Sequence, residues 1–342
     1  MQIRDIVVIG ASAGGIEALI QLCGGLPADL PAAVLIVQHT SPTGPSLLAR
    51  LLGRVSAMPV IAAVENEPVR PGRIYVSVPD RHLLLREGRL LVRRGPYENR
   101  TRPAADALFR SAAVAYGSRV IGVVLTGSLD DGTDGLIAIK RGGGTCVVQA
   151  PEDAAWPSMP LHALRRDHVD HSVALADLPA LLTRLVALQA GPSHELPEPI
   201  RIEDRIAAEE SPMVSHEFEP PGHPSPLSCP SCGGVLNEIA DEDTVRYRCQ
   251  IGHAFTALGL GCAQAEEVEH GLQIAIRTHR ERLTLFQRMR DAAQQRGQPH
   301  AATRWATAAT EAEQLARAME QALSLLSLSA ADIRRDEEVP ET

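Results

Sequence analysis

Short apolar runs alternate with amphipathic stretches through the first half of the chain. The runs at residues 5–9 and 33–38 are apolar at nearly every position, which is typical of strands buried on both faces, and residues 16–22 between them have helical composition. Further strands are predicted at residues 60–64, 73–78, 83–85, 90–92, 120–125 and 146–148, and further helices at 44–52, 103–116, 133–141 and 177–188. This repetition predicts an α/β fold with a doubly wound, mostly parallel sheet flanked by helices.

The pattern changes after residue 189. Prolines interleave with Glu, Ser and His up to residue 227, which predicts a semi-extended linker and leaves open a short ordered piece around residues 200–208. A short cysteine-containing stretch follows, and then two amphipathic helices separated at Gly297-Gln298-Pro299, as in an antiparallel hairpin. The predicted divisions are an α/β domain at 1–189, the linker at 190–227, a small cysteine module at 228–261, a helical hairpin at 262–330 and a charged tail at 331–342.

Composition narrows the class of protein. Of the 342 residues 44% are hydrophobic, enough for a sizeable core, and the net charge of −9 argues against general affinity for nucleic acid. No apolar run approaches the roughly 20 residues of a membrane span, so we expect no membrane insertion. The first strand begins so close to Met1 that no signal peptide fits before it. A cytoplasmic protein is therefore expected.

The first predicted strand ends in Gly10-Ala11-Ser12-Ala13-Gly14-Gly15, a G-x-S-x-G pattern at a strand-to-helix turn. Ser12 stands at the crest of this turn, and we interpret it as a nucleophile. Two alternatives compete with this interpretation. The stretch nearly matches the dinucleotide-binding fingerprint, although serine replaces the middle glycine, and Ser12 could simply cap the helix.

Polar residues also follow two other strands. His39 comes directly after residues 33–38, and Asp130 and Asp131 follow 120–125. Because the carboxyl ends of parallel strands share one edge of a sheet, these side chains are expected to meet Ser12 there. Serine, histidine and aspartate are the set that acyl transfer needs. Each residue alone has a structural interpretation, as a helix cap or a loop histidine. The order Ser, His, Asp excludes the α/β-hydrolase fold but not esterase chemistry.

Six stretches resemble, in order, the catalytic domain of the chemotaxis receptor methylesterases, the CheB family. They are G-A-S-A-G-G at 10–15, V-Q-H-T-S-P at 37–42, P-G-R-I-Y-V at 71–76, D-R-H at 80–82, R-P-A-A-D-A-L-F at 102–109 and L-T-G-S-L-D-D-G-T-D-G at 125–135. The resemblance covers residues 5 to about 188. It implies hydrolysis of glutamate γ-methyl esters on receptor cytoplasmic helices, with no cofactor for catalysis. It also implies a triad of Ser12, His39 and Asp131, with Asp130 as the backup candidate.

The backbone N–H groups of Ala13, Gly14 and Ser128 are the predicted oxyanion donors. The chain departs from the family at two of these places: Ala13 replaces a threonine, and Ser128-Leu129 replaces the usual Met-Gly. Family members usually carry a receiver domain before the esterase, whereas this chain starts on the catalytic strand. Control by the C-terminal half or by another protein is therefore expected. Two alternative functions remain open, namely deamidation of receptor glutamine by the same triad, and a catalytically inactive scaffold in a signalling complex.

Two further residue pairs have the spacing of metal ligands. Cys229-x2-Cys232 and Cys249-x3-His253 together predict a tetrahedral Cys3His shell, typical of a structural zinc site. Residues 235–239 and 244–247 are the two predicted strands of a zinc ribbon, and so small a module would depend on the metal for its stability. The alternative is four unliganded side chains. We expect the ribbon and the helical hairpin to dock signalling-complex proteins or to self-associate.

Overall fold

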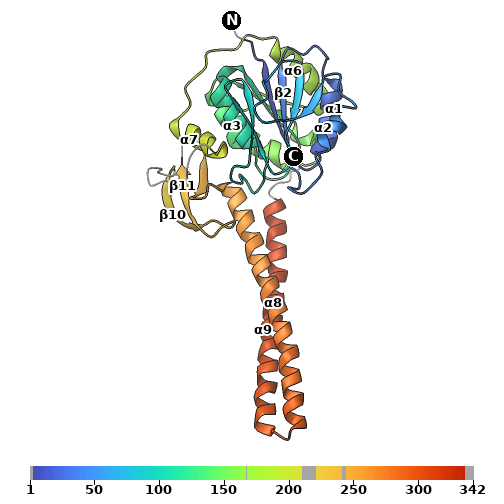
Figure 1. Cartoon of the computed structure of the whole chain (residues 1–342), viewed down its shortest axis with the longest axis vertical. Coiled ribbons are helices and arrows are strands. Elements are labelled where there is room, and N and C mark those ends of the chain that lie inside the picture. The colour runs from blue at the N-terminus through green and yellow to red at the C-terminus, as the bar shows by residue number, and fades with distance from the viewer. Residues whose placement is uncertain (1–2, 167, 210–220, 241–243, 336–342) are drawn as a thin grey trace. The chain divides into compact units, whose positions relative to one another are not determined.

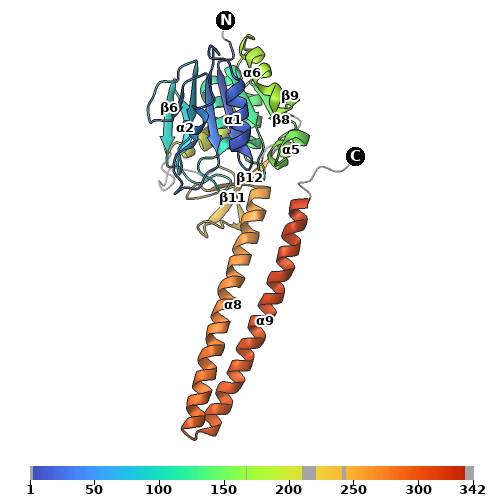
Figure 2. The same ribbon diagram turned by 90° about the vertical axis from the view of Figure 1, so that its right-hand side faces the viewer.

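The computed structural model describes residues 3–166, 168–209, 221–240 and 244–335. Parts of the predicted linker, at 210–220, and of the predicted tail, at 336–342, lie outside the described residues. The chain divides into two compact units, one built from residues up to Leu260 and one that starts at Gly261. Figure 1 and Figure 2 show the chain from two directions.

A seven-stranded sheet, parallel at every pairing, forms the centre of the first unit. Its strands lie in the order β3-β4-β2-β1-β7-β8-β9. They are β1 (Ile6–Ala11), β2 (Ala33–Gln38), β3 (Val60–Ala62), β4 (Arg73–Val76), β7 (Val120–Val124), β8 (Thr145–Gln149) and β9 (His171–Val173). The predicted parallel α/β fold is confirmed, and β9 was not anticipated because its residues, His171, Ser172 and Val173, form no apolar run.

Helices cover both faces of this sheet, and β1 shows why its residues are apolar at every position. Ile6 and Val8 belong to the core on one face, together with Phe109, whereas Val7 and Ile9 belong to the core on the other face. The helices are α1 (Gly15–Gly25), α2 (Leu48–Leu52), α3 (Ala105–Tyr116), α4 (Thr133–Arg141), α5 (Ser158–Leu164) and α6 (Leu178–Val186). In Figure 1, β2 lies between α3 and the pair α1 and α2.

An antiparallel hairpin of β5 (His82–Arg86) and β6 (Arg89–Arg93) packs beside α3. Its turn consists of Glu87 and Gly88, both with positive φ, which is the geometry that matches the twist of a two-residue hairpin. Leu83 and Leu85 of β5 extend the core that contains Phe109.

The cysteine module is a four-stranded antiparallel sheet rather than the two-stranded ribbon predicted from the sequence. Helix α7 (Glu198–Ala207) precedes it, and its strands are β10 (His223–Ser228), β11 (Val235–Ala240), β12 (Val245–Cys249) and β13 (Ala254–Thr256). Helix α7 coincides with the short ordered piece allowed around residues 200–208, whereas most of β10 lies in the segment predicted as semi-extended linker. Pro224 and Pro226 are tolerated in β10 because it is an edge strand, where a missing N–H breaks no ladder.

Two long helices, α8 (Ala257–Gln295) and α9 (Pro299–Arg335), form the predicted hairpin, and the second unit begins within α8 at Gly261. Gly297, with a φ of 67°, turns the chain, and Pro299 opens α9 at a position where its missing N–H costs nothing. Phe286 and Trp305 stack with their ring centroids 5.6 Å apart across the hairpin. No helix in the described part of the chain is both long and apolar enough to cross a membrane.

Candidate active site

Ser12 is fixed at the carboxyl end of β1 by its own backbone. Its N–H donates to the carbonyl of Thr126 at 3.0 Å, and its carbonyl accepts from the Gln38 side-chain amide at 2.7 Å and from the N–H of Gly15 at 2.9 Å. Gly14 adopts a φ of +70°, a left-handed conformation that suits glycine and lets the chain turn directly into α1. The Ser12 hydroxyl is thereby held at the edge of the sheet.

His39 follows β2 and lies between Ser12 and Asp131. Its Nδ1 is 3.1 Å from the Ser12 Oγ, and its Nε2 is 2.7 Å from Asp131 Oδ2. A neutral ring that donates its Nε2–H to the carboxylate leaves Nδ1 free to accept the serine proton. The structure therefore brings together the serine, histidine and aspartate predicted from three separate strand ends.

Asp131 is buried and surrounded by donors. It accepts from the N–H groups of Ala105 at 2.6 Å and Asp106 at 3.2 Å, at the N-terminus of α3, and from the Asn99 amide at 3.0 Å. Burial by itself raises the pKa of Asp131, but the bonds from His39 and the other donors outweigh burial and hold this pKa below its ordinary value. Asp131 is thus an ionised partner for the imidazole.

Asp130, the backup candidate, makes a different contact. Its Oδ1 accepts from the hydroxyl of Thr256 at 2.9 Å, and of the two aspartates it is Asp131 that contacts the imidazole. Burial raises the pKa of Asp130 to about 6, since the Thr256 hydroxyl offsets only part of the lost hydration. The geometry favours Asp131 as the histidine partner.

The predicted oxyanion donors line the turn around Ser12. Within the described residues, the backbone N–H groups of Ala13, Gly14 and Ser128 have no protein acceptor. The loop that carries Ser128 packs tightly against the serine: a Cβ on Gly127 would lie 2.0 Å from the Met159 sulfur and 2.8 Å from the Ser12 Cβ. Free N–H groups this close to a nucleophile are suited to stabilise a developing oxyanion.

Sequence reasoning assigned no role to two polar residues beside the triad, Asn99 and Asp106. Asp106 accepts from the N–H groups of Gly132 at 2.9 Å and Gly135 at 2.7 Å, and so ties α3 to the start of α4. Burial and the neighbouring carboxylates, Asp131 foremost, raise its pKa well above the ordinary value. Asp106 lies within the R-P-A-A-D stretch, but nothing in that stretch indicates which atoms it contacts.

The four predicted metal ligands converge in the small sheet. Cys229, Cys232, Cys249 and His253 have all their ligand atoms within 4.8 Å of one another. The Cys232 and Cys249 sulfurs are 3.7 Å apart, and the His253 Nδ1 is 3.6 Å from the sulfurs of Cys229 and Cys249. Tetrahedral Zn–S bonds of about 2.3 Å would place two sulfurs about 3.8 Å apart. The donor set and its spacing fit a closed, four-coordinate zinc site.

Comparisons with known proteins agree with the α/β domain. The family model described as CheB methylesterase matches residues 7–182. A relative from Anaeromyxobacter dehalogenans (strain 2CP-C), named protein-glutamate methylesterase/protein-glutamine glutaminase 5, is 40% identical over 184 residues, which cover 53% of this chain and 51% of the relative. A similarly named relative from Methanosarcina acetivorans is 38% identical over 191 residues, 54% of each chain. The chain spans about half the length of these curated relatives.

A solved structure extends the comparison to three dimensions. The crystal structure of the Thermotoga maritima CheB methylesterase catalytic domain is similar to this chain with a TM-score of 0.51 and 33% sequence identity. The match covers 53% of this chain and 98% of that domain. The likeness therefore concerns the α/β domain.

Proposed function

Because the chain belongs to the CheB methylesterase family, we propose that it hydrolyses glutamate γ-methyl esters on chemoreceptor-type proteins, with Ser12 as the nucleophile. The observation that carries the proposal is the continuous hydrogen-bonded line from the Ser12 hydroxyl through His39 to Asp131. Such a line activates a serine without any cofactor.

Each group has a defined task in this mechanism. His39 Nδ1 takes the hydroxyl proton as the Ser12 oxygen attacks the ester carbonyl, and Asp131 stabilises the resulting imidazolium. The N–H groups of Ala13, Gly14 and Ser128 receive the negative charge of the tetrahedral intermediate. The proton then passes from His39 to the leaving methanol. A water molecule repeats the sequence and frees the glutamate carboxylate. With an amide in place of the ester the same steps deamidate glutamine and release ammonia.

The surface beside the triad supports a helical protein substrate. A cavity of about 220 Å³ next to His39 is lined by its neighbours Gln38 and Thr40 and by apolar side chains that include Leu47 and Leu51. Trp156 is 54% exposed and lies against Gly14 of the serine turn. Apolar residues one turn from the methylated glutamate would fit this surface. A receptor cytoplasmic helix as substrate implies a cytoplasmic enzyme.

The first test is methanol release from methyl-labelled receptor membranes. Wild-type protein should release labelled methanol, and Ser12→Ala should reduce the rate by about 10⁴-fold or more, because no other group can form the acyl intermediate. Equal release by the two proteins would refute the serine mechanism. Binding of methylated receptor without any release by wild-type protein would favour the alternative, an inactive scaffold.

We further propose that Cys229, Cys232, Cys249 and His253 hold a structural zinc ion and that the helical hairpin docks a signalling-complex protein. Metal analysis of the purified full chain should find about one zinc per chain. Chelation should lower the midpoint of thermal unfolding, since the small sheet depends on the metal. The matched control is Cys262→Ser, which lies outside the cluster and should retain the metal. Wild-type protein that contains no zinc would contradict this assignment.

A further inference from the structure

The strand that follows the metal cluster continues into the active site. His253, a predicted ligand, directly precedes β13, whose residues bond with the 97–99 loop. The N–H of Ala254 donates to the carbonyl of Tyr97 at 3.0 Å, and the N–H of Asn99 donates to the carbonyl of Ala254 at 2.9 Å. The metal module is therefore attached by backbone hydrogen bonds to a loop that touches the triad.

Asn99 contacts both the β13 backbone and the triad residue Asp131. Its side-chain oxygen accepts from the backbone N–H of Thr256 at 3.1 Å. This fixes the amide so that its NH2 group faces two carboxylates, Asp131 at 3.0 Å and Asp106 at 2.7 Å. An amide turned the other way would present its oxygen to both carboxylates and leave the Thr256 N–H without an acceptor. The β13 backbone thus selects the orientation in which Asn99 supports Asp131.

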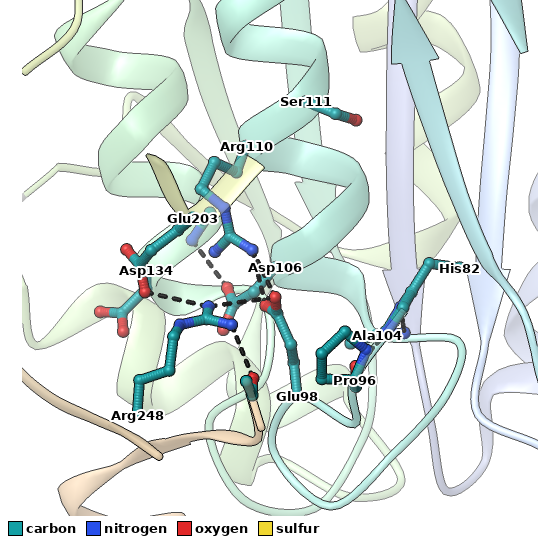
Figure 3. A network of polar contacts seen from close by, with 12 residues as sticks. His82, Pro96, Glu98, Ala104, Asp106, Arg110, Ser111, Asp134, Glu203 and Arg248 are labelled. Atoms are coloured by element: carbon teal, nitrogen blue, oxygen red, sulfur yellow. Dashed lines mark hydrogen bonds and ion pairs between the residues drawn. The ribbon is translucent and has the colours of Figure 1, made fainter. Parts of the chain in front are cut away.

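A buried ion network fastens the same sheet to the α/β domain (Figure 3). Glu98, next to Asn99, pairs with Arg110 of α3 at 2.7 Å and with Arg248 of β12 at 3.2 Å. Arg248 also pairs with Glu203 of α7 at 3.1 Å, and donates to the carbonyl of Gly252 at 2.8 Å, within the loop between the ligands Cys249 and His253. All four charged side chains are buried. The metal loop, the network and the Asn99 loop therefore form one packed assembly.

We propose that Asn99 is a positioning residue for Asp131 and that the metal-bearing sheet, through β13, holds Asn99 in the working orientation. The inference rests on the proposed esterase function. It makes the C-terminal module part of the catalytic apparatus: correct placement of the triad aspartate depends on a strand more than 120 positions later in the chain.

The test compares two asparagines that both adopt positive φ, Asn99 at 48° and Asn66 at 66°. Asn99→Gly removes the amide without straining the backbone, and Asn66→Gly controls for the exchange itself. Asn99→Gly should lower kcat for methanol release by about tenfold with KM unchanged, as expected for loss of one hydrogen bond to a charged group. Asn99→Asp should lose more, because it places a third carboxylate against Asp131 and Asp106. A kcat for Asn99→Gly within twofold of Asn66→Gly, or a loss confined to KM, overturns the proposal.

Two readouts do not depend on turnover. The downfield proton NMR signal of the His39–Asp131 hydrogen bond, assigned with His39→Ala, should shift or disappear in Asn99→Gly and stay in Asn66→Gly. A chromogenic chelator should extract zinc several-fold faster from Asn99→Gly, since β13 loses one of its anchors. An unchanged proton signal, or equal extraction rates in both variants, counts against the coupling. If the wild-type protein releases no methanol, but Asn99→Gly still changes the proton signal and the rate of zinc extraction relative to Asn66→Gly, the esterase function is refuted and the positioning role remains supported.

Discussion

An Asp131→Asn variant is expected to release methanol about 10⁴-fold more slowly than wild-type protein at pH 7. The asparagine keeps the size of the side chain but presents an NH2 group to His39 in place of a carboxylate oxygen. The imidazole then carries its proton on Nδ1, facing Ser12, and cannot accept the hydroxyl proton. The loss should appear in kcat, because the bond concerned supports the imidazolium that forms during the reaction.

Asp130→Asn is the matched control for this prediction. Asp130 bonds with Thr256, and a neutral asparagine retains an oxygen for that hydroxyl, so we expect kcat within about threefold of the wild-type value. Its effect on stability should depend on pH. The folded chain keeps the Asp130 proton up to about pH 6, whereas the ordinary value is 3.8, so wild-type stability falls as pH rises through this range. Asp130→Asn removes that contribution. Equal losses of activity in the two variants would contradict the assignment of Asp131.

An Arg248→Met variant is expected to lower the free energy of unfolding by about 3–5 kcal/mol at pH 7. Arg248 is among the most completely buried large side chains, and its removal leaves the buried carboxylates of Glu203 and Glu98 with one cationic partner fewer. Urea unfolding, followed by Trp156 fluorescence in a Trp305→Phe background, measures the first unit alone. Arg94→Met removes an exposed ion pair with Asp80 and should cost less than about 1 kcal/mol. If both variants lose a similar free energy of unfolding, the buried network stabilises the fold no more than an exposed ion pair does.

The same network predicts an acid limit. Burial raises the pKa of Glu98, but Arg110 and Arg248 outweigh burial and lower this pKa to about 2, against an ordinary 4.5. The folded state then releases this proton more readily than the unfolded state. Glu98 therefore stabilises the fold fully above pH 4.5, and its contribution is lost as pH falls from 4.5 towards 2. In Arg248→Met this part of the pH dependence should shrink.

Much of the α/β domain could be predicted because its buried strands are runs of apolar residues. Residues 33–37 are all apolar, since both faces of β2 are covered, and polar residues that follow such a run stand at the sheet edge where sites collect. This reasoning led to Ser12, His39 and the pair Asp130 and Asp131 from strand ends, and the resemblance to the methylesterase family then selected Asp131. The cluster of three cysteines and one histidine was also predicted from spacing, because a tetrahedral metal shell constrains short sequence separations.

Other features could not be predicted because their causes are not local. Asn99 matters through a left-handed backbone conformation and a donor at Thr256, which no pattern within its own loop encodes. Proline-rich β10 reads as linker until its place at a sheet edge is known. Arg248 and Glu98 are separated by 150 positions, and charged residues are normally expected in solvent.

The ion network that joins Glu98, Arg110, Glu203 and Arg248 has a consequence for protein engineering. A chain that ends at residue 189 would lack Arg248, so Glu98 would keep only Arg110 as an ion-pair partner. The surface that the small sheet and α7 cover would then be exposed to solvent. A transfer of the α/β domain to another scaffold should therefore include residues 3–260 as one piece, with the four proposed metal ligands. A chimera that replaces the residues after 189 with those of a homologue would need to retain all four charged side chains of this network.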